Sequence, residues 1–251
     1  VFILGEAFSD MALNENLNFD NYIDPLENFK KIKEDSISGH IVVPGVGGGT
    51  ADTEFDILTG LNTRYLRGAP FSYRLVTHDF ESIPSFLKGL GYDTVAVHPG
   101  YKWFYNRQNV YKYFGIDKFI NISDFPNATY KGMYVSEKDT IDRFIDVYKE
   151  HKNKSNSPLF TLGVTIQNHG PYPDKYLYDA NLTKPNFNSN LDLTDAEKNA
   201  LSNYFEGLKD ADIQLKRLLD FYNKQDEPIV VVYWGDHLPA FKQEIYNKFL
   251  L

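Results

Sequence analysis

Short runs of β-branched and aromatic residues alternate along this chain with stretches that carry hydrophobic residues at helical spacing. The predicted strands are Val1–Leu4, Gly39–Val43, Tyr92–Val97, Leu159–Thr165 and the run IVVVYW, residues 229–234. The shorter predicted helices are Pro25–Lys33, Thr50–Leu58, Ile83–Leu90 and the region around Asn109–Phe114. Because IVVVYW is hydrophobic at every position, it is typical of a strand covered on both faces. The alternation predicts an α/β fold with a mostly parallel central sheet and helices on both faces.

Two longer helices carry capping signals at their starts. In SEKDTIDRFIDVYKEH, Ser136 and Asp139 form a variant capping box ahead of a helical hydrophobic pattern. Thr194 and Glu197 cap the second helix in the same way. Its predicted buried side consists of Leu201, Phe205, Leu208, Leu215 and Leu218. The preceding stretch, Gly170–Leu193, is polar, and a loop of this length is usually functional or disordered.

Length and composition point to one domain, residues 1–251, with 42% hydrophobic residues to form its core. The net charge of -8 argues against a protein that holds nucleic acid by broad counterion release. The absence of cysteine excludes disulfides, thiolate metal sites and thiol catalysis. No apolar run reaches the roughly 18–20 residues of a membrane-spanning helix. The chain opens directly on the strand-like VFILG, so we expect it to be a piece of a longer protein.

Polar residues with catalytic or metal-binding potential follow four of the predicted strands. Glu6 follows VFILG, His98 follows YDTVAV, His169 follows FTLGVTIQN, and Asp236 and His237 follow IVVVYWG. Open α/β sheets bind ligands beyond the carboxyl ends of their strands, so these residues are expected to meet in one pocket. Taken singly, each has an alternative: Glu6 as a helix-start acid and the others as ordinary turn residues.

The stretch GVGGGTADTEFDILTG, residues 45–60, places four glycines ahead of Thr50 at a predicted helix start. Glycines let the main chain approach a ligand closely, and a helix N-terminus is a natural seat for a phosphate. Thr50 is therefore a candidate nucleophile for phosphoryl transfer. Alternatively it only caps the helix, and Thr53 with Asp56 competes for either role. The segment lacks the GK[ST] ending of a P-loop.

The segment HPGYKWFYNR, residues 98–107, supplies further candidates. The guanidinium of Arg107 suits phosphate oxygens. Trp103, Phe104 and Tyr105 could shape a pocket for a polyol or headgroup. In the alternative interpretation the aromatic residues belong to the core and Arg107 is a surface cation.

Taken in order, five motifs resemble those of a known family. They are GEAFSD with Glu6, GGGTADTEF with Thr50, His98 with WFYNR, QNHG with His169, and YWGDH. Together they resemble the lipoteichoic acid synthase group, phosphoglycerol transferases of the alkaline phosphatase and sulfatase superfamily. The similarity runs from residue 1 to about residue 240. It implies an alkaline phosphatase-like α/β domain.

The resemblance also implies roles for individual residues. Thr50 would be the nucleophile, and Glu6, Asp236 and His237 would join it around one divalent cation, usually manganese. Three oxygen ligands and one imidazole suit Mn²⁺ or Mg²⁺ better than a metal that prefers thiolates, and Zn²⁺ stays an alternative.

The same match places the phosphoglycerol group against four other residues. His98, Arg107 and His169 would contact it, with His169 also a candidate proton donor. Better-known members have a tryptophan where this chain has Tyr105, so the polyol contact at that position is open.

Family members act outside the cell on phosphatidylglycerol, are anchored in the cell membrane by upstream helices, and transfer phosphoglycerol to a glycerol phosphate polymer or a glycolipid. A Gram-positive-type bacterium is the expected source. Members also continue beyond Gly-Asp-His, so C-terminal truncation is expected here. Three rivals share the fold: a formylglycine sulfatase, whose C/S-x-P-x-R motif is missing here; a phosphoethanolamine transferase; and a catalytically silent domain that binds glycerol phosphate polymer.

Overall fold

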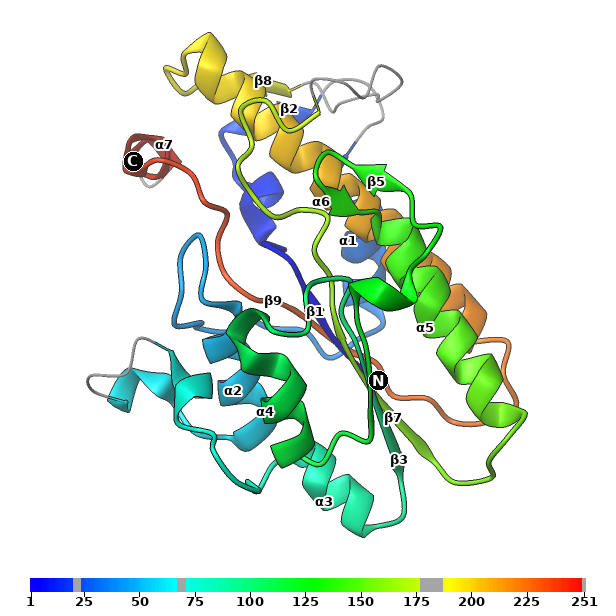
Figure 1. Cartoon of the computed structure of the whole chain (residues 1–251). Coiled ribbons are helices and arrows are strands. Elements are labelled where there is room, and N and C mark those ends of the chain that lie inside the picture. Colours follow the sequence, from blue (N-terminus) through cyan, green and yellow to red (C-terminus); the bar gives the residue numbers. More distant parts are fainter. Residues whose placement is uncertain (20–23, 67–70, 177–186, 250–251) are drawn as a thin grey trace.

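A five-stranded sheet lies at the centre of the molecule in the computed structural model, which describes residues 1–19, 24–66, 71–176 and 187–249 (Figure 1). The strand order is β4–β3–β7–β1–β9, and every neighbouring pair is parallel. The strands are β1 (Phe2–Gly5), β3 (Asp93–Val97), β4 (Lys118–Ile120), β7 (Leu159–Val164) and β9 (Val232–Gly235). The predicted parallel sheet is confirmed.

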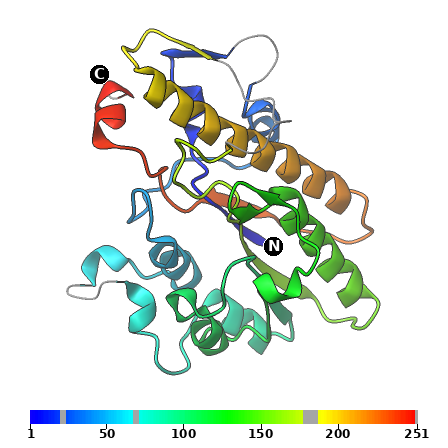
Figure 2. The same ribbon diagram turned by 45° about the horizontal axis from the view of Figure 1, so that its top comes forward.

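Helices cover both faces of this sheet, as predicted (Figures 1 and 2). The helices are α1 (Glu27–Glu34), α2 (Thr50–Thr59), α3 (Ile83–Gly89), α4 (Arg107–Tyr113), α5 (Glu137–Lys152), α6 (Asp195–Tyr222) and α7 (Gln243–Phe249). Side chains of α2 and α4, including Phe55 and Val110, pack with Phe160 and Leu162 of β7 on one face. Side chains of α5 and α6 pack with Ile3 of β1 on the other. Helices α2 and α4 therefore bury apolar side chains against one face of the sheet, and α5 and α6 bury theirs against the other.

The two predicted helix starts differ in their caps. Thr194 and Glu197 form a reciprocal capping box at the start of α6, and the predicted buried side of that helix is confirmed. At α5, the Ser136 hydroxyl accepts a hydrogen bond from the main-chain N–H of Asp139. The Asp139 carboxylate accepts from Thr129 instead of returning to Ser136, so only half of the predicted box forms there.

Two predicted strands differ from the structure. The segment Gly39–Val43 forms no strand, and Val42 is fully exposed. Only the last part of IVVVYW is in β9, one of the two edge strands of the described sheet. Val230, ahead of the strand, is 73% exposed, and Val232, its first residue, is 38% exposed. The prediction of a strand covered on both faces was therefore wrong. A hydrophobic run favours extended structure, but the position of a strand in its sheet depends on partners elsewhere in the chain.

Two short antiparallel pairs lie outside the main sheet. In one, β2 (Leu17–Phe19) pairs with β8 (Phe187–Ser189), which falls in the segment predicted to be a loop. Residues 177–186 of that segment lie outside the described residues. In the other pair, β5 (Tyr130–Lys131) joins β6 (Tyr134–Val135) ahead of α5.

The register of the central strands brings their carboxyl ends to one edge. Gly5 of β1 is opposite Gly235 of β9, and Leu4 is opposite Val164 of β7. Val97 of β3 is opposite Gly163. The polar residues that follow these strands therefore leave the sheet on the same side.

Candidate active site

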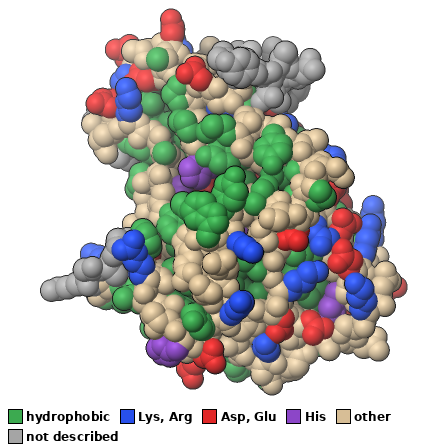
Figure 3. All heavy atoms as spheres, in the orientation of Figure 1, with side chains coloured by type: hydrophobic (Ala, Val, Ile, Leu, Met, Phe, Trp, Pro, Cys, Tyr) green, Lys and Arg blue, Asp and Glu red, His purple; other side chains and the backbone are tan. Residues whose placement is uncertain are grey.

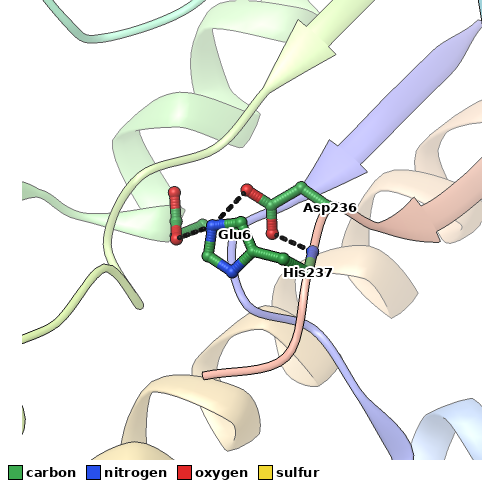
Figure 4. A group of neighbouring side chains, drawn as sticks. All are labelled: Glu6, Asp236 and His237. Carbon is green, nitrogen blue, oxygen red and sulfur yellow. Dashed lines mark hydrogen bonds and ion pairs between the residues drawn. The ribbon is translucent and has the colours of Figure 1, made fainter. Parts of the chain in front are cut away.

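Three residues that follow β1 and β9 converge at this edge of the sheet. Figure 4 shows the side chains of Glu6, Asp236 and His237 pointing toward one another. One carboxylate or imidazole atom from each lies within 4.8 Å of the other two, and all three residues are buried. His237 Nε2 is 3.1 Å from Asp236 Oδ2 and 3.6 Å from Glu6 Oε1. Residues 230 positions apart in the chain thus form one compact group.

Thr50, the first residue of α2, belongs to the same group. Its hydroxyl donates a hydrogen bond of 2.8 Å to Asp236 Oδ2. The residue before the helix proper is Gly49, so the alternative in which Thr50 only caps α2 is wrong. Thr53, the other candidate, donates instead to the main-chain carbonyl of Asp236 at 2.7 Å. Thr53 therefore supports the Asp236 backbone, whereas Thr50 faces the carboxylate.

The glycine-rich loop is fixed to the exit of β9. The N–H of Gly47 donates to the carbonyl of Leu238 at 2.8 Å. Gly47, Gly48 and Gly49 all have positive φ angles, of 69°, 157° and 91°. These values favour glycine, because a side chain is strained in that region. The loop therefore turns sharply enough to place Thr50 beside Asp236, which a loop of ordinary residues could not do at low cost.

The donor atoms of this group fit a divalent cation. His237 Nδ1 donates to the Leu238 carbonyl at 2.8 Å, an orientation that turns Nε2 toward the carboxylates, where it can serve as a metal ligand. His237 Nε2 and Glu6 Oε1 are buried without a hydrogen-bond partner among the described residues. Buried polar atoms without partners are costly, and a bound cation would satisfy both. Two carboxylates, a hydroxyl and an imidazole suit Mn²⁺ or Mg²⁺, and also accept Zn²⁺.

The pKa values of the two carboxylates, Glu6 and Asp236, also indicate a cation site. Burial raises the pKa of Glu6 well above its ordinary value, and the neighbouring charge of Asp236 adds to the increase. Burial also raises the pKa of Asp236, although His237 and the Thr50 hydroxyl partly oppose this. Two buried carboxylates at this distance are therefore costly to ionise together unless a positive charge lies between them.

A second buried group surrounds Arg107. Its guanidinium forms an ion pair with Glu54, in which Arg107 Nε lies 3.1 Å from Glu54 Oε1. The hydroxyls of Tyr73 and Tyr111 donate to the other Glu54 oxygen at 2.8 and 2.7 Å. Burial is the largest single influence and lowers the pKa of the Arg107 guanidinium, but Glu54, Tyr111 and Tyr73 together raise that pKa above its ordinary value. The alternative in which Arg107 is a surface cation is wrong.

His98 joins this second group to the end of β7. One ring nitrogen, Nδ1, donates to the Val164 carbonyl at 2.9 Å, so Nε2 is free to accept from Arg107, 3.3 Å away. Burial lowers the pKa of His98 well below its ordinary value, with Arg107 as the second cause. His98 is therefore neutral at pH 7 and presents Nε2 as an acceptor.

His169 lies next to these groups without a hydrogen bond to either among the described residues. Its Nδ1 is 2.7 Å from the Gly170 carbonyl and 3.1 Å from the Tyr134 hydroxyl. The Lys175 ammonium donates to the His169 carbonyl at 3.0 Å. Burial lowers the pKa of Lys175 to about 7, against the opposing charge of Glu6 and others. The other ring nitrogen of His169, Nε2, makes no hydrogen bond to the described residues.

Tyr105 has an unusual backbone conformation beside the site. Its φ is 53° and that of Asn106 is 59°, a region that is strained for non-glycine residues and common at functional sites. The Arg107 guanidinium lies over the Tyr105 ring, 5.2 Å from its centroid. Burial raises the pKa of the Tyr105 hydroxyl, which lies close enough to Gly49 for the N–H of that residue to oppose the increase.

Most of these residues could be predicted from the sequence, but the residues that hold them in place by hydrogen bonds could not. Glu54 was not predicted, although it lies one helical turn after Thr50 in TADTEF, a spacing that places both on one side of α2. Thr165, which accepts a hydrogen bond from the N–H of Glu6 at 3.0 Å, was also missed. Neither has a sequence signal of its own, because a carboxylate or a threonine in a strand or helix is usually structural.

The fold and the clustered polar residues define an alkaline phosphatase-like α/β domain. A model of the sulfatase family matches residues 1–249. The chain belongs to the sulfatase family, and the predicted resemblance to the lipoteichoic acid synthase group is confirmed by its relatives.

Three of these relatives illustrate the likeness. A putative cyclic β-1,2-glucan modification protein of Rhizobium meliloti is 32% identical over 217 residues, 86% of this chain and 32% of that protein. The lipoteichoic acid synthase of Staphylococcus aureus is 26% identical over 197 residues, 76% of this chain and 28% of the synthase. The structure of the Streptococcus pyogenes phosphoglycerol transferase GacH in complex with sn-glycerol-1-phosphate matches with a TM-score of 0.80 and 26% identity, covering 98% of this chain and 63% of that one.

The chain thus spans about a third of these two curated relatives. Among the described residues, no helix is both long and apolar enough to cross a membrane.

Proposed function

We propose that this domain transfers phosphoglycerol from phosphatidylglycerol to a hydroxyl acceptor through a covalent intermediate on Thr50. The observation that carries the proposal is the 2.8 Å hydrogen bond from the Thr50 hydroxyl to Asp236, inside the buried group of Glu6, Asp236 and His237. A threonine hydroxyl is a poor nucleophile unless its environment favours the alkoxide. The likeness to phosphoglycerol transferases supports the nature of the group transferred.

Glu6, Thr50, Asp236 and His237 would hold the divalent cation, with Mn²⁺ preferred and Mg²⁺ or Zn²⁺ as alternatives. When bound, such a cation lowers the pKa of the threonine hydroxyl and neutralises charge on a phosphoryl oxygen. The chain itself supplies a preformed arrangement: Gly47 fixes the loop, and the Leu238 carbonyl orients the His237 ring.

In the first step, Thr50 Oγ1 forms a bond to the lipid phosphorus while the bond to the diacylglycerol oxygen breaks. The hydroxyl proton leaves toward Asp236, which already accepts its hydrogen bond. His169, as the imidazolium, gives a proton from Nε2 to the departing alkoxide. In the second step, His169 Nε2 takes the proton of the acceptor hydroxyl, whose oxygen forms a bond to phosphorus while the bond from phosphorus to Thr50 Oγ1 breaks. Asp236 returns its proton to Thr50 Oγ1, so the free hydroxyl is restored.

His98, Tyr105 and Arg107 would bind the phosphoglycerol group. Arg107 is held in place by Glu54, so little conformational entropy remains to be lost when it binds a phosphate oxygen. His98 Nε2 accepts from Arg107 and could also accept from a glycerol hydroxyl. Tyr105 borders both Arg107 and the glycine loop.

The acceptor is a glycerol phosphate polymer or a glycolipid, and the relative named for glucan modification favours a carbohydrate hydroxyl. We place the activity on the outer side of the cell membrane, in a longer protein whose upstream helices anchor residues 1–251 as one catalytic domain. Transfer of phosphoethanolamine on the same fold is the main rival.

The test uses the purified domain with Mn²⁺ and vesicles of fluorescent phosphatidylglycerol or phosphatidylethanolamine. We expect diacylglycerol release from phosphatidylglycerol and the mass of phosphoglycerol on the peptide that carries Thr50. Thr50→Ser keeps a hydroxyl and should retain some release, whereas Thr50→Ala should have none. Release that persists in Thr50→Ala would refute the nucleophile, and a preference for the ethanolamine lipid would support the rival.

A further inference from the structure

Three aromatic side chains are exposed in the loop between β3 and α4, close to the candidate active site. Tyr101 and Trp103 are each 62% exposed, and Phe104 is 46% exposed. The rings of Tyr101 and Trp103 are nearly parallel, with an interplanar angle of 19° and centroids 5.4 Å apart. Exposed aromatic residues gathered in this way usually mark a binding surface. Figure 3 shows hydrophobic side chains gathered on one face of the molecule, among charged and other groups.

The loop that carries these rings is closed by hydrogen bonds of its own main chain. Three main-chain hydrogen bonds of 2.9–3.0 Å close it: Phe104 N–H to Tyr101, Asn106 N–H to Trp103 and Gln108 N–H to Lys102. The positive φ angles of Tyr105 and Asn106 require this support. These bonds order the backbone that carries the exposed rings before any ligand arrives, which lowers the entropic cost of binding.

Ring contacts connect this surface to the site of Thr50. The Trp103 ring packs edge-on against Phe104, with centroids 6.0 Å apart, and Phe104 packs against Tyr105 at 4.5 Å. Tyr105 in turn lies against Arg107 and beside Gly49, the residue before Thr50. A ligand on the exposed rings would thus be connected to Thr50, the proposed nucleophile, through Phe104, Tyr105 and Gly49.

We propose that Tyr101 and Trp103 form a subsite for a saccharide acceptor, in which a sugar ring stacks its C–H face on the exposed aromatic rings. This inference rests on the proposed transferase function. The flat, near-parallel pair suits a flat apolar face, and the sugar hydroxyls around that face need polar partners. Lys102 and Asn106 are exposed in the same loop and supply them. The Asn106 side chain is itself oriented by Asn109, whose amide donates to it at 2.7 Å.

The charge of the protein favours a saccharide over a lipid bilayer at this surface. Aromatic side chains also occur at membrane interfaces, but peripheral binding to anionic lipids depends on clustered basic residues. The chain has a net charge of -8, and Lys102 is the one basic residue in 98–106. A neutral sugar has no such requirement.

The chain allows a direct optical test, because it has only two tryptophans. Trp103 is exposed, whereas Trp234 is 8% exposed. Linear β-1,2-, β-1,3- and α-1,4-linked gluco-oligosaccharides are titrated into the Mn²⁺-loaded domain, with tryptophan emission and calorimetry as readouts. We expect at least one of them to shift the emission to shorter wavelength. Trp103→Phe should abolish the optical signal but keep most of the calorimetric affinity, because a ring remains.

Trp103→Ala should weaken the affinity by about tenfold, the size of one aromatic contact. Phe86→Ala, on α3, removes an equally exposed ring away from this loop and serves as the matched control. In the transfer assay, Trp103→Ala should lower the ratio of transfer to hydrolysis by about tenfold.

Three results would overturn the subsite. One is the absence of binding by all three sugars at millimolar concentration, and another is equal affinity in Trp103→Ala and wild type. The third is a loss of vesicle binding in Trp103→Ala with no effect on sugars, which would indicate a membrane contact. A wild-type domain that binds sugar but forms no adduct on Thr50 would instead refute the proposed function and leave the subsite standing.

Discussion

Glu54→Gln is the sharpest test of the buried network behind the candidate site. The substitution removes the negative charge that compensates Arg107 and keeps an oxygen to accept from Tyr73 and Tyr111. Both members of the ion pair are fully buried, with 2% and 0% of their side chains exposed. Breaking such a pair by removing one partner costs about 3–5 kcal/mol, because a buried charge is left uncompensated. For a domain of this size that loss lowers Tm by about 10 °C.

The matched control is Glu27→Gln on α1, which removes an exposed pair with Lys31. That pair is solvated, so its loss should cost about 0.5 kcal/mol or less. Both variants are compared with wild type by urea and thermal unfolding. The Mn²⁺-induced rise in Tm should survive in Glu54→Gln, since Glu54 is not in the predicted metal group. If Glu54→Gln lowers the free energy of unfolding by no more than about 1 kcal/mol beyond the control, the buried ion pair between Glu54 and Arg107 is refuted.

Three further predictions concern the metal, the pH and the core. Saturating Mn²⁺ should stabilise the domain by about 2–4 kcal/mol, and Asp236→Asn should abolish that shift; equal shifts would exclude Asp236 as a ligand. Burial raises the pKa of Glu137 from 4.5 to about 8, so its contribution to stability is present below about pH 4.5 and is lost as the pH rises to 8, by at most about 1.4 kcal/mol per unit. In metal-free unfolding experiments, Glu137→Gln should remove the contribution of Glu137 to the loss of unfolding free energy between pH 4.5 and 8. An unchanged dependence of stability on pH would contradict the raised pKa of Glu137. Gly163→Ala would place Cβ 1.8 Å from Phe144 Cζ and should cost about 1–3 kcal/mol, whereas Gly89→Ala, with open space around it, should not destabilise; equal effects would refute the close packing.

Much of the fold could be predicted from the sequence because its signals are local. The capping box of Thr194 and Glu197 and the buried side of α6 follow from residues three or four positions apart. The same holds for the strands ahead of Glu6 and Asp236. Local signals failed for Gly39–Val43, whose apolar residues meet no neighbouring strand in the described structure.

The candidate site, too, was predictable from local sequence signals only in part. The sequence indicated that polar residues follow the strands, and the sheet rule predicted that they meet. The glycines ahead of Thr50 and the family resemblance favoured Thr50 as the nucleophile, but Thr53 stayed a competitor because both hydroxyls lie at the start of one helix. The structure separates them, since one faces the Asp236 carboxylate and the other its carbonyl. The metal and substrate roles of these residues stay predictions that the experiments above test.

By itself, then, the sequence determined the helices, the central strands β1, β3 and β7, and the polar side chains that follow these strands, because backbone preference and amphipathic spacing depend on near neighbours. Only the tertiary structure decided that β9 lies at the end of the described sheet, that Glu54 holds Arg107, and that Thr50 reaches Asp236 across 186 positions. Those outcomes depend on which distant surfaces pack together, a property of the whole chain that no short stretch encodes.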